Sequence, residues 1–240
     1  MNDHLRKVGA LFRKDFADTF KNVNVSILLI LPIFFALLYS MMDFGGERMP
    51  ASFVLTVSVL MNVCLVPANF LSMTIAEEKE KHTLRTLMLS NVSAGEFLVS
   101  KALVTYLFMQ AVNLVVFFVT GQGLGELARF VGVTTLGSVC MIMIGAAAGI
   151  LSKDQMSTSV ITLPFSLAFL IPPMFAGANE VFTAIARFVP TTAMMNLFLG
   201  APENPAWYDA TGYQVLIIGL WTAAALAAFV LIYRKKRLDN

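Results

Sequence analysis

Six long apolar stretches constrain this chain more than any other feature of its sequence. None contains an Asp, Glu, Lys, Arg or His, and each is close to the roughly 20 residues that a helix needs to cross about 30 Å of hydrocarbon. Hydrophobic residues make up 58% of the 240 residues, against about 45–50% in a soluble domain, so lipid must solvate much of the chain. The stretches are residues 25–42, 53–75, 102–120, 130–151, 156–175 and 213–233.

Helices suit these stretches better than strands do. In lipid every backbone N–H and C=O needs a partner, and a helix supplies it within its own segment. The alternation of apolar and polar residues that marks a membrane barrel is absent from the sequence. The sequence therefore predicts an all-α membrane protein with six transmembrane helices. We expect the first apolar stretch to remain as an anchor rather than to be a cleaved signal, because it is long enough to span.

The basic residues indicate how the chain is oriented. With the N-terminus in the cytoplasm, 14 of the 17 Lys and Arg residues fall in inside segments, and only Arg48, Arg129 and Arg187 fall outside. Cytoplasmic segments carry such an excess of Lys and Arg. We therefore expect both termini in the cytoplasm and the chain in the plasma (inner) membrane. Six spans are favoured over five or seven, because an odd number would place the two basic ends on opposite sides.

The N-terminal segment, residues 1–23, has an amphipathic pattern. Apolar residues recur every three or four positions, with Arg, Lys and Asp in between, which places them on one face of a helix. Such a helix is expected to lie in the inner interface of the membrane, with packing on a soluble partner as the alternative. The apolar face consists of Leu5, Val8, Phe12, Phe16 and Phe20.

The outer segment before the last span, residues 176–212, is predicted to form two short helices. An apolar stripe runs up to Pro190, and Thr191 or Thr192 is a candidate cap for a second helix that Gly200 ends. Both helices are too short to span, so we expect re-entrant or interfacial helices on the outer side.

The inside segment between the second and third spans, residues 76–101, carries the most distinctive charges. Its first residues alternate acid and base, and Ser93 with Glu96 forms the capping box that starts the next helix. Three apolar residues in between recur at helical spacing. The residues singled out here are Glu77, Glu78, Glu80, Thr83, Leu84, Leu87 and Met88. A solvated helix face is the simplest explanation of the charges alone.

Motifs for catalysis, metal binding and nucleotide binding are missing from the sequence. No G-x-x-x-x-G-K-[ST], H-E-x-x-H or G-x-S-x-G occurs. Cys64 and Cys140 lie in apolar stretches without ligand spacing, and His4 and His82 are far apart in sequence. We therefore expect no catalytic residue, no metal and no cofactor on this chain. A net charge of +2 gives no general attraction to nucleic acid.

Polar residues within the spans are all neutral. Such groups either hydrogen-bond between helices or line a substrate path. The lack of an ionisable group weakens the case for an ion-driven carrier, although backbone carbonyls can bind ions. The candidates are Asn62, Asn69, Gln110 and Asn113, together with Ser138 and Ser166.

A G-x-x-x-G motif lies in the fourth span. Gly145 and Gly149 stand four residues apart and permit two helices to approach closely. The partner helix is expected in the same subunit, with a dimer seam as the alternative.

The charged loop resembles the signature of ABC-2 type transporter permeases. In that family an E-x-E-x-G-T-L-E-x-L-L run follows the second span and a Lys opens the third, as Lys101 does here. Residues 152–173 look like the fifth span of the family, and residues 187–198 look like its outer helix before the sixth. Two positions depart from the pattern, since His82 replaces the usual Gly and Arg85 the common Glu.

The resemblance implies a single transmembrane domain over residues 1–240, which would be the permease subunit of an ATP-driven transporter, usually an exporter. A separate ABC ATPase would bind ATP and Mg²⁺, and a second permease would form a homo- or heterodimer with this one. The loop of residues 76–101 would be the coupling helix that docks on the ATPase through the seven residues singled out above.

Two other functions remain as alternatives. An ion-coupled secondary carrier or channel should show an intramembrane coupling group, and none is visible in the sequence. A membrane-embedded enzyme should show His, Asp or Glu gathered near one membrane face. The sequence offers only Glu77, Glu78 and Glu80, which are interleaved with Lys and paired with no His.

Overall fold

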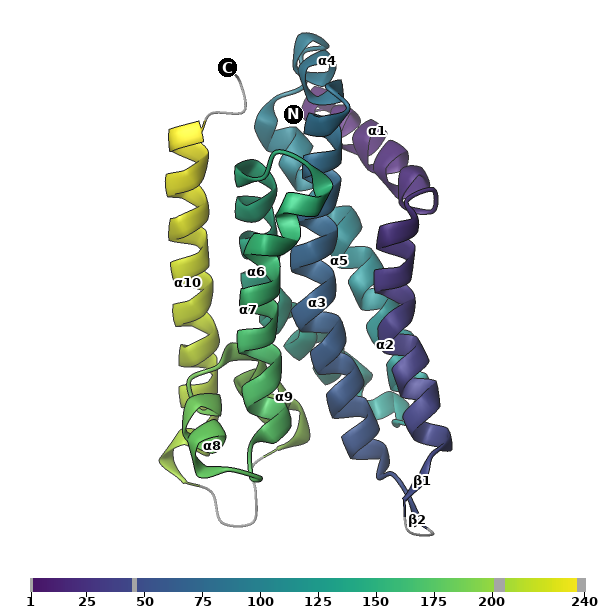
Figure 1. Ribbon diagram of the computed structural model, residues 1–240, viewed down its shortest axis with the longest axis vertical. Coiled ribbons are helices and arrows are strands. Elements are labelled where there is room, and N and C mark those ends of the chain that lie inside the picture. Colours follow the sequence, from purple (N-terminus) through teal and green to yellow (C-terminus); the bar gives the residue numbers. More distant parts are fainter. Residues whose placement is uncertain (1, 45–46, 201–205, 237–240) are drawn as a thin grey trace.

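The computed structural model describes residues 2–44, 47–200 and 206–236, and it is almost entirely helical. Figure 1 shows an elongated bundle in which the long helices run side by side. The helices are α1 (Asn2–Thr19), α2 (Val23–Met41), α3 (Ala51–Glu80), α4 (Thr83–Leu89), α5 (Ala94–Val119), α6 (Leu127–Leu151), α7 (Gln155–Phe175), α8 (Glu180–Ala186), α9 (Pro190–Leu199) and α10 (Thr211–Lys236). Two 3-10 turns, η1 (Leu124–Glu126) and η2 (Trp207–Asp209), and a two-residue hairpin, β1 (Asp43–Phe44) with β2 (Glu47–Arg48), complete the described chain.

The prediction of six transmembrane helices is confirmed. Helices α2, α3, α5, α6, α7 and α10 are each long and apolar enough to cross a membrane. Their connections alternate between the two ends of the bundle, so α1, α4 and the end of α10 lie at one end and α8, α9 and the hairpin at the other (Figure 1). The chain is therefore an integral membrane protein.

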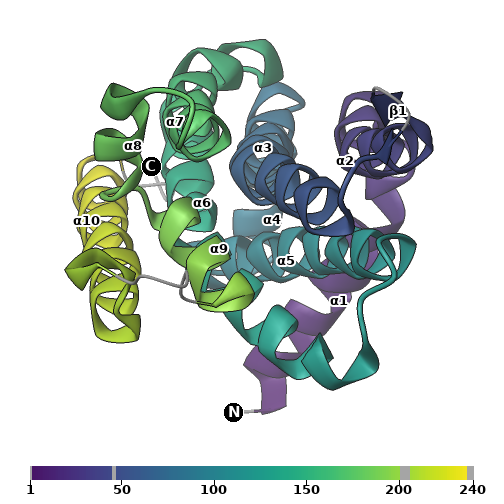
Figure 2. The same ribbon diagram turned by 90° about the horizontal axis from the view of Figure 1, so that it is seen from below.

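Helix α3 is the centre of the bundle. It packs against α2, α5, α6 and α7, and Figure 2 shows it surrounded by these helices. Of its most apolar stretch 67% is buried, against 17% for α2 and for α10, which lie at the edges. Helix α3 also continues to Glu80, five residues beyond the predicted span, because its charged last turn finds partners within the protein.

The two glycines of the G-x-x-x-G motif in α6 face α3 in the same chain. A Cβ at Gly145 would lie 2.7 Å from the carbonyl oxygen and 2.8 Å from the Cα of Ala68. A Cβ at Gly149 would lie 2.8 Å from the Cβ of Ile75. The G-x-x-x-G motif thus packs helices within the subunit.

Helix α1 lies at a slant across one end of the bundle and packs on α5 (Figure 1). Its buried residues are Leu11, Asp15 and Thr19, whereas Phe16 and Phe20 of the predicted apolar face are exposed by 41% and 67%. The chain turns after Thr19, and the Asn22 side chain caps α2 by accepting the Val25 N–H at 3.3 Å. The aromatic face therefore points partly outward, although Phe16 and Phe20 also contact the Phe108 ring of α5, with ring centroids 5.0 Å and 5.4 Å apart. The buried contact with the bundle is made by both apolar and polar residues of α1.

The outer segment forms two short helices, α8 and α9, bent by 86° relative to each other. Pro190 occupies the first position of α9 and Val189 precedes it as the cap, so the prediction that Thr191 or Thr192 caps this helix is wrong. Proline suits the first position because the N–H that it lacks would be unpaired there anyway. The Thr191 hydroxyl instead donates to the Phe169 carbonyl at 2.6 Å. Residues 201–205 of the predicted segment lie outside the described residues.

We predict that Gly145→Ala destabilises the bundle by about 1–3 kcal/mol, because the added methyl group meets backbone atoms that cannot move aside. Gly132→Ala in the same helix is the control, since a Cβ there meets nothing within 4 Å. This control should be neutral or stabilising by up to about 1 kcal/mol. Thermal unfolding in detergent measures both, and equal midpoints for the two variants would contradict the close approach of α6 to α3.

Candidate functional site

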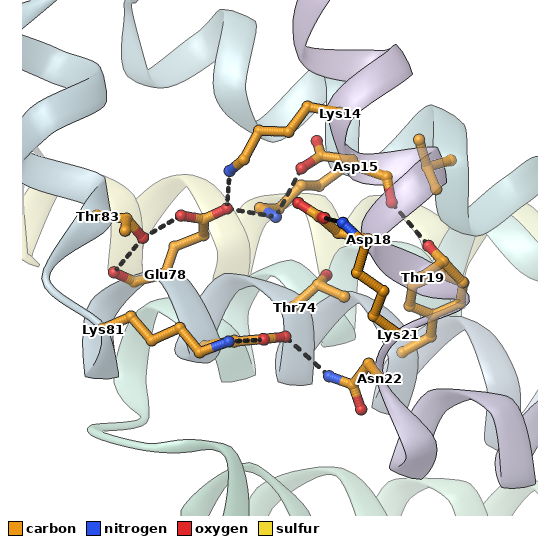
Figure 3. A pocket seen from close by; sticks show the side chains of 14 residues that line it. Lys14, Asp15, Asp18, Thr19, Lys21, Asn22, Thr74, Glu78, Lys81 and Thr83 are labelled. Atoms are coloured by element: carbon orange, nitrogen blue, oxygen red, sulfur yellow. Dashed lines mark hydrogen bonds and ion pairs between the residues drawn. The ribbon is translucent and has the colours of Figure 1, made fainter.

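Charged side chains gather where α1, the end of α3 and the start of α5 converge (Figure 3). They surround a cavity of about 250 Å³. Basic and acidic groups are balanced around it, which suits a junction between helices better than a pocket for a highly charged ligand. The charged groups are Lys14, Lys21, Lys81 and Lys101 with Asp15, Asp18, Glu77 and Glu78.

Lys101 is the most deeply buried of these charges, with 4% of its surface exposed. Its Nζ lies 3.1 Å from Asp15 Oδ1 and 3.5 Å from Glu78 Oε1. The Ser100 hydroxyl donates to the other Asp15 oxygen at 2.9 Å. A buried ammonium is tolerated only when such partners surround it, so Lys101 holds α1 and α3 against α5.

Glu78 of α3 connects its helix to three others, α1, α4 and α5. It accepts hydrogen bonds from Lys14 of α1 at 2.6 Å and from the Thr83 hydroxyl at the start of α4, in addition to its contact with Lys101. Partial burial lowers the pKa of Lys14, but the hydrogen bond and charge of Glu78 outweigh it, so this pKa lies above its ordinary value. Lys14 is therefore fully charged near neutral pH, and the pair with Glu78 is maintained.

The other two glutamates of the charge run also have partners within the chain. Glu77 accepts from Asn22 Nδ2 at 2.8 Å and from Lys81. Glu80 accepts the backbone N–H of Gln155 at 3.2 Å, at the start of α7. The last turn of α3 is thus tied to the start of α2 and to the α6–α7 connection, and its glutamates are anchors rather than a free acidic row.

Helix α4 presents its predicted apolar stripe mainly to the bundle. Leu84, Leu87 and Met88 are partly buried and pack against a core cluster that includes Ile75 and Phe97. The apolar residue that α4 exposes is Leu89, at 80%. Leu89 was not predicted from the sequence, because helical spacing identifies the side of a helix that packs, and Leu89 lies off that side.

The turn between α3 and α4 depends on the backbone of His82. This residue has a φ of 57°, in the left-handed region, where glycine carries no steric cost. The resemblance noted above has glycine at this position, so the structure supplies the physical reason for that preference. The turn after α4 is fastened too, since Lys7 Nζ donates to the Asn91 carbonyl at 2.9 Å.

Three of the polar candidates within the spans form one buried network. Asn62 of α3 donates to Asn113 Oδ1 at 2.7 Å, and Asn113 donates to Gln110 Oε1 at 2.9 Å. Gln110 in turn contacts Thr134 and Thr135 of α6. The exposed fractions are 0% for Asn62, 1% for Asn113 and 7% for Gln110. In this structure these residues connect α3, α5 and α6.

Asn69, the fourth candidate, connects α3 to α7. Its Oδ1 accepts from the Thr162 hydroxyl at 2.6 Å, and its Nδ2 lies 3.5 Å from Ser166 Oγ. Asn69 is 5% exposed and both partners are fully buried. The geometry is again that of a contact between helices.

Residues suited to metal binding do not come together in the described part of the chain. No group of three His, Cys, Asp or Glu residues has the geometry to hold an ion there. Cys64 and Cys140 are buried as free thiols. The charged groups of the junction pair with one another, so this site holds helices in place.

We predict that Lys101→Met destabilises the protein by about 3–5 kcal/mol, because Asp15 and Glu78 then remain buried without their shared cation. Lys21→Met is the matched control. Its ion pair with Asp18 is exposed, so the loss there should stay below about 1 kcal/mol. Thermal unfolding in detergent compares the two variants, and a similar small shift in both would show that the buried cluster is not essential to the fold.

We also predict that His82→Gly is neutral or stabilises the α3–α4 turn by up to about 1 kcal/mol, whereas His82→Val destabilises it by about 1–2 kcal/mol. A branched side chain tolerates positive φ poorly. Hydrogen exchange of α4 amides would detect both effects. Thr86→Gly, in the middle of α4, is the control and should increase exchange. Increased exchange in His82→Gly would contradict the left-handed turn.

The comparison with known families agrees with this architecture. The profile of the ABC-2 family transporter proteins matches residues 49–234, from the start of α3 to the last turns of α10. No individually curated protein matches the chain at a significant level. The matched region covers five of the six spans, together with helix α4 between the second and third spans. The chain therefore belongs to the ABC-2 family of transporter proteins, and it is a non-catalytic membrane component for transport.

Proposed function

We propose that this chain is the permease subunit of an ABC exporter, driven by a separate ABC ATPase. Membership of the ABC-2 family implies association with an ABC ATPase in general. The sequence has no phosphate-binding loop of its own, so ATP and Mg²⁺ would be held by the partner. Export is the direction that the family resemblance favours.

Attachment of α4 on several sides is the observation that carries this proposal. Glu78 bonds Thr83 at its start, Lys7 bonds Asn91 after its end, and Leu84, Leu87 and Met88 pack on α3 and α5. A load applied to α4 would therefore move these spans as one body, as rigid-body coupling requires. Glu77, Glu78, Glu80 and Thr83 act as anchors in this arrangement, and Leu89 supplies the outward apolar contact with the ATPase.

The proposed orientation has both termini in the cytoplasm of a cell whose plasma (inner) membrane holds the protein. The basic end of α10 and helix α4 lie at the same end of the bundle (Figure 1), which fits the preference of Lys and Arg for the cytoplasm. Helix α1 would lie in the interface there with Phe16 and Phe20 in the acyl boundary. Helices α8 and α9 would be re-entrant or interfacial on the outer side.

A second permease subunit, identical or related, would complete the transporter. The interior of one bundle is occupied by packed helices, since Asn62, Asn69, Gln110 and Asn113 are used in contacts between helices. This leaves the boundary between two subunits as the place for a pathway. The large exposed apolar faces of α2 and α10 are available for lipid or for such a partner.

We predict that Leu89→Asp abolishes binding of the ATPase while the permease still inserts and folds. The substitution leaves every span unchanged, and a carboxylate buried in the docking surface without a partner costs several kcal/mol. Leu89→Met keeps the apolar contact and is the control. Co-purification and the mass of the complex in nanodiscs give the readout, with two permeases and two ATPases expected for the parent. Unchanged binding by Leu89→Asp would exclude α4 as the docking helix.

A further inference from the structure

An apolar groove runs along the side of the bundle between α7 and α10, away from the charged junction. It has a volume of about 380 Å³, and α6 forms its floor. Nearly all of its lining is apolar. The groove is lined by Ile144, Ala147, Ala148 and Leu151 of α6, Ile161 and Phe165 of α7, and Trp221, Ala224, Ala225, Ala228 and Ile232 of α10.

The length and depth of the groove match one leaflet of a bilayer. It follows α10 from Trp221 to Ile232, which are separated along the helix axis by about 16 Å at a rise of about 1.5 Å per residue. Half of the hydrocarbon thickness is about 15 Å. The groove lies in the half of the bundle that ends at α4 and Lys236, and Trp221 closes it near the middle of the span, where its Nε1 donates to the Phe188 carbonyl at 2.7 Å.

Basic residues surround the end of the groove at the membrane surface. Lys153 lies in the α6–α7 connection, and Lys236 continues the groove-lining stripe of α10 one turn beyond Ile232; both are exposed. Lys79 adds a further charge, since its Nζ donates to the Gly149 and Ile150 carbonyls at the end of α6 and its charge repels that of Lys236. Arg234 and Lys235 stand on the same turn of α10.

Two acidic groups in the described part of the chain near this end accept hydrogen bonds from backbone donors. Asp154 caps α7 by accepting the Ser157 N–H at 2.8 Å, and Glu80 accepts the Gln155 N–H. Among the described residues, neither Lys153 nor Lys236 forms an ion pair with a carboxylate. Of the residues that the structure describes, five basic groups, Lys79, Lys153, Arg234, Lys235 and Lys236, outnumber these two carboxylates, so the mouth of the groove has a net positive charge.

We propose that this groove binds an anionic glycerophospholipid, with one acyl chain between α7 and α10 and the headgroup phosphate at Lys153 and Lys236. An apolar slot as long as one leaflet accounts for the chain. A basic mouth at the membrane surface accounts for the preference for an anionic headgroup, as in basic pockets between transmembrane helices that bind anionic lipids. The site is separate from α4, so it does not depend on the proposed docking of the ATPase.

Trp221 makes the site measurable by fluorescence. The chain has only one other tryptophan, Trp207, so Trp207→Phe leaves Trp221 as the single reporter. This variant of the full chain is reconstituted in phosphatidylcholine vesicles with small fractions of dibrominated phosphatidylglycerol or dibrominated phosphatidylcholine. We expect saturable quenching with a preference of at least severalfold for phosphatidylglycerol. Equal quenching by both lipids, or no saturable quenching by either because a second copy covers the groove, would overturn the proposal.

Charge variants test the headgroup contact. Lys153→Gln and Lys236→Gln should each reduce the preference for phosphatidylglycerol over phosphatidylcholine by about fivefold. The two substitutions together should remove the preference. Arg13→Gln with Lys21→Gln removes the same charge from α1 and the turn that follows it, far from the groove, and should leave the preference unchanged. A localised headgroup site is contradicted if the preference survives in the variant that combines Lys153→Gln and Lys236→Gln. It is also contradicted if the control variant lowers the preference equally.

A steric variant tests the acyl-chain contact. Ala228→Phe places a large side chain in the groove and should remove the saturable component of quenching. Ala227→Phe is the control, because Ala227 is exposed on another side of α10 and does not line the groove. Equal effects of the two variants would refute binding in the groove.

A second measurement needs no substitution. Native mass spectrometry of the unaltered chain after detergent extraction should show retained phospholipid enriched in anionic species relative to the membrane from which it was extracted. Retention of zwitterionic lipid only, or in proportion to the membrane, would overturn the proposal.

Discussion

The buried ammonium of Lys101 can exist at its position only because Asp15 and Glu78 approach it from two other helices. An unpaired charge with 4% exposure would cost several kcal/mol of folding free energy. The arrangement of α1, α3 and α5 at this end of the bundle is therefore coupled to one cluster of charges. Helix α4 is fastened to the same cluster through the bond between Glu78 and Thr83.

A different kind of interaction holds the membrane-embedded part together. Between helices in lipid the hydrophobic effect contributes little, so close packing and neutral hydrogen bonds provide the association. Gly145 brings α6 against the backbone of α3, and Asn62, Asn113 and Gln110 join α3, α5 and α6. Helix α3 takes part in both the charged cluster and this network. A displacement of α4 would consequently be carried into the centre of the bundle by a single continuous helix.

The candidate site was predicted from the sequence in its location but not in its contacts. The charged loop between the second and third spans was recognised, and the capping box of Ser93 and Glu96 is confirmed. Asp15 was overlooked as a contact residue, because the stripe of Phe residues beside it dominates the periodic pattern of α1. Leu89 was overlooked for a related reason, since periodicity identifies buried faces and gives no signal for a single exposed leucine.

The sequence alone determined that this is a membrane protein with six helical spans, because the length of an apolar stretch and the cost of unpaired backbone groups in lipid are local properties of the chain. It also indicated the G-x-x-x-G motif and the break at Pro190, which depend on the geometry of single residues. Only the tertiary structure decided which partners Glu77, Glu78 and Glu80 take, and which helix lies against Gly145. Those contacts join residues far apart in sequence, such as Glu80 and Gln155, which are separated by 75 positions, and their geometry follows from how the helices pack in three dimensions.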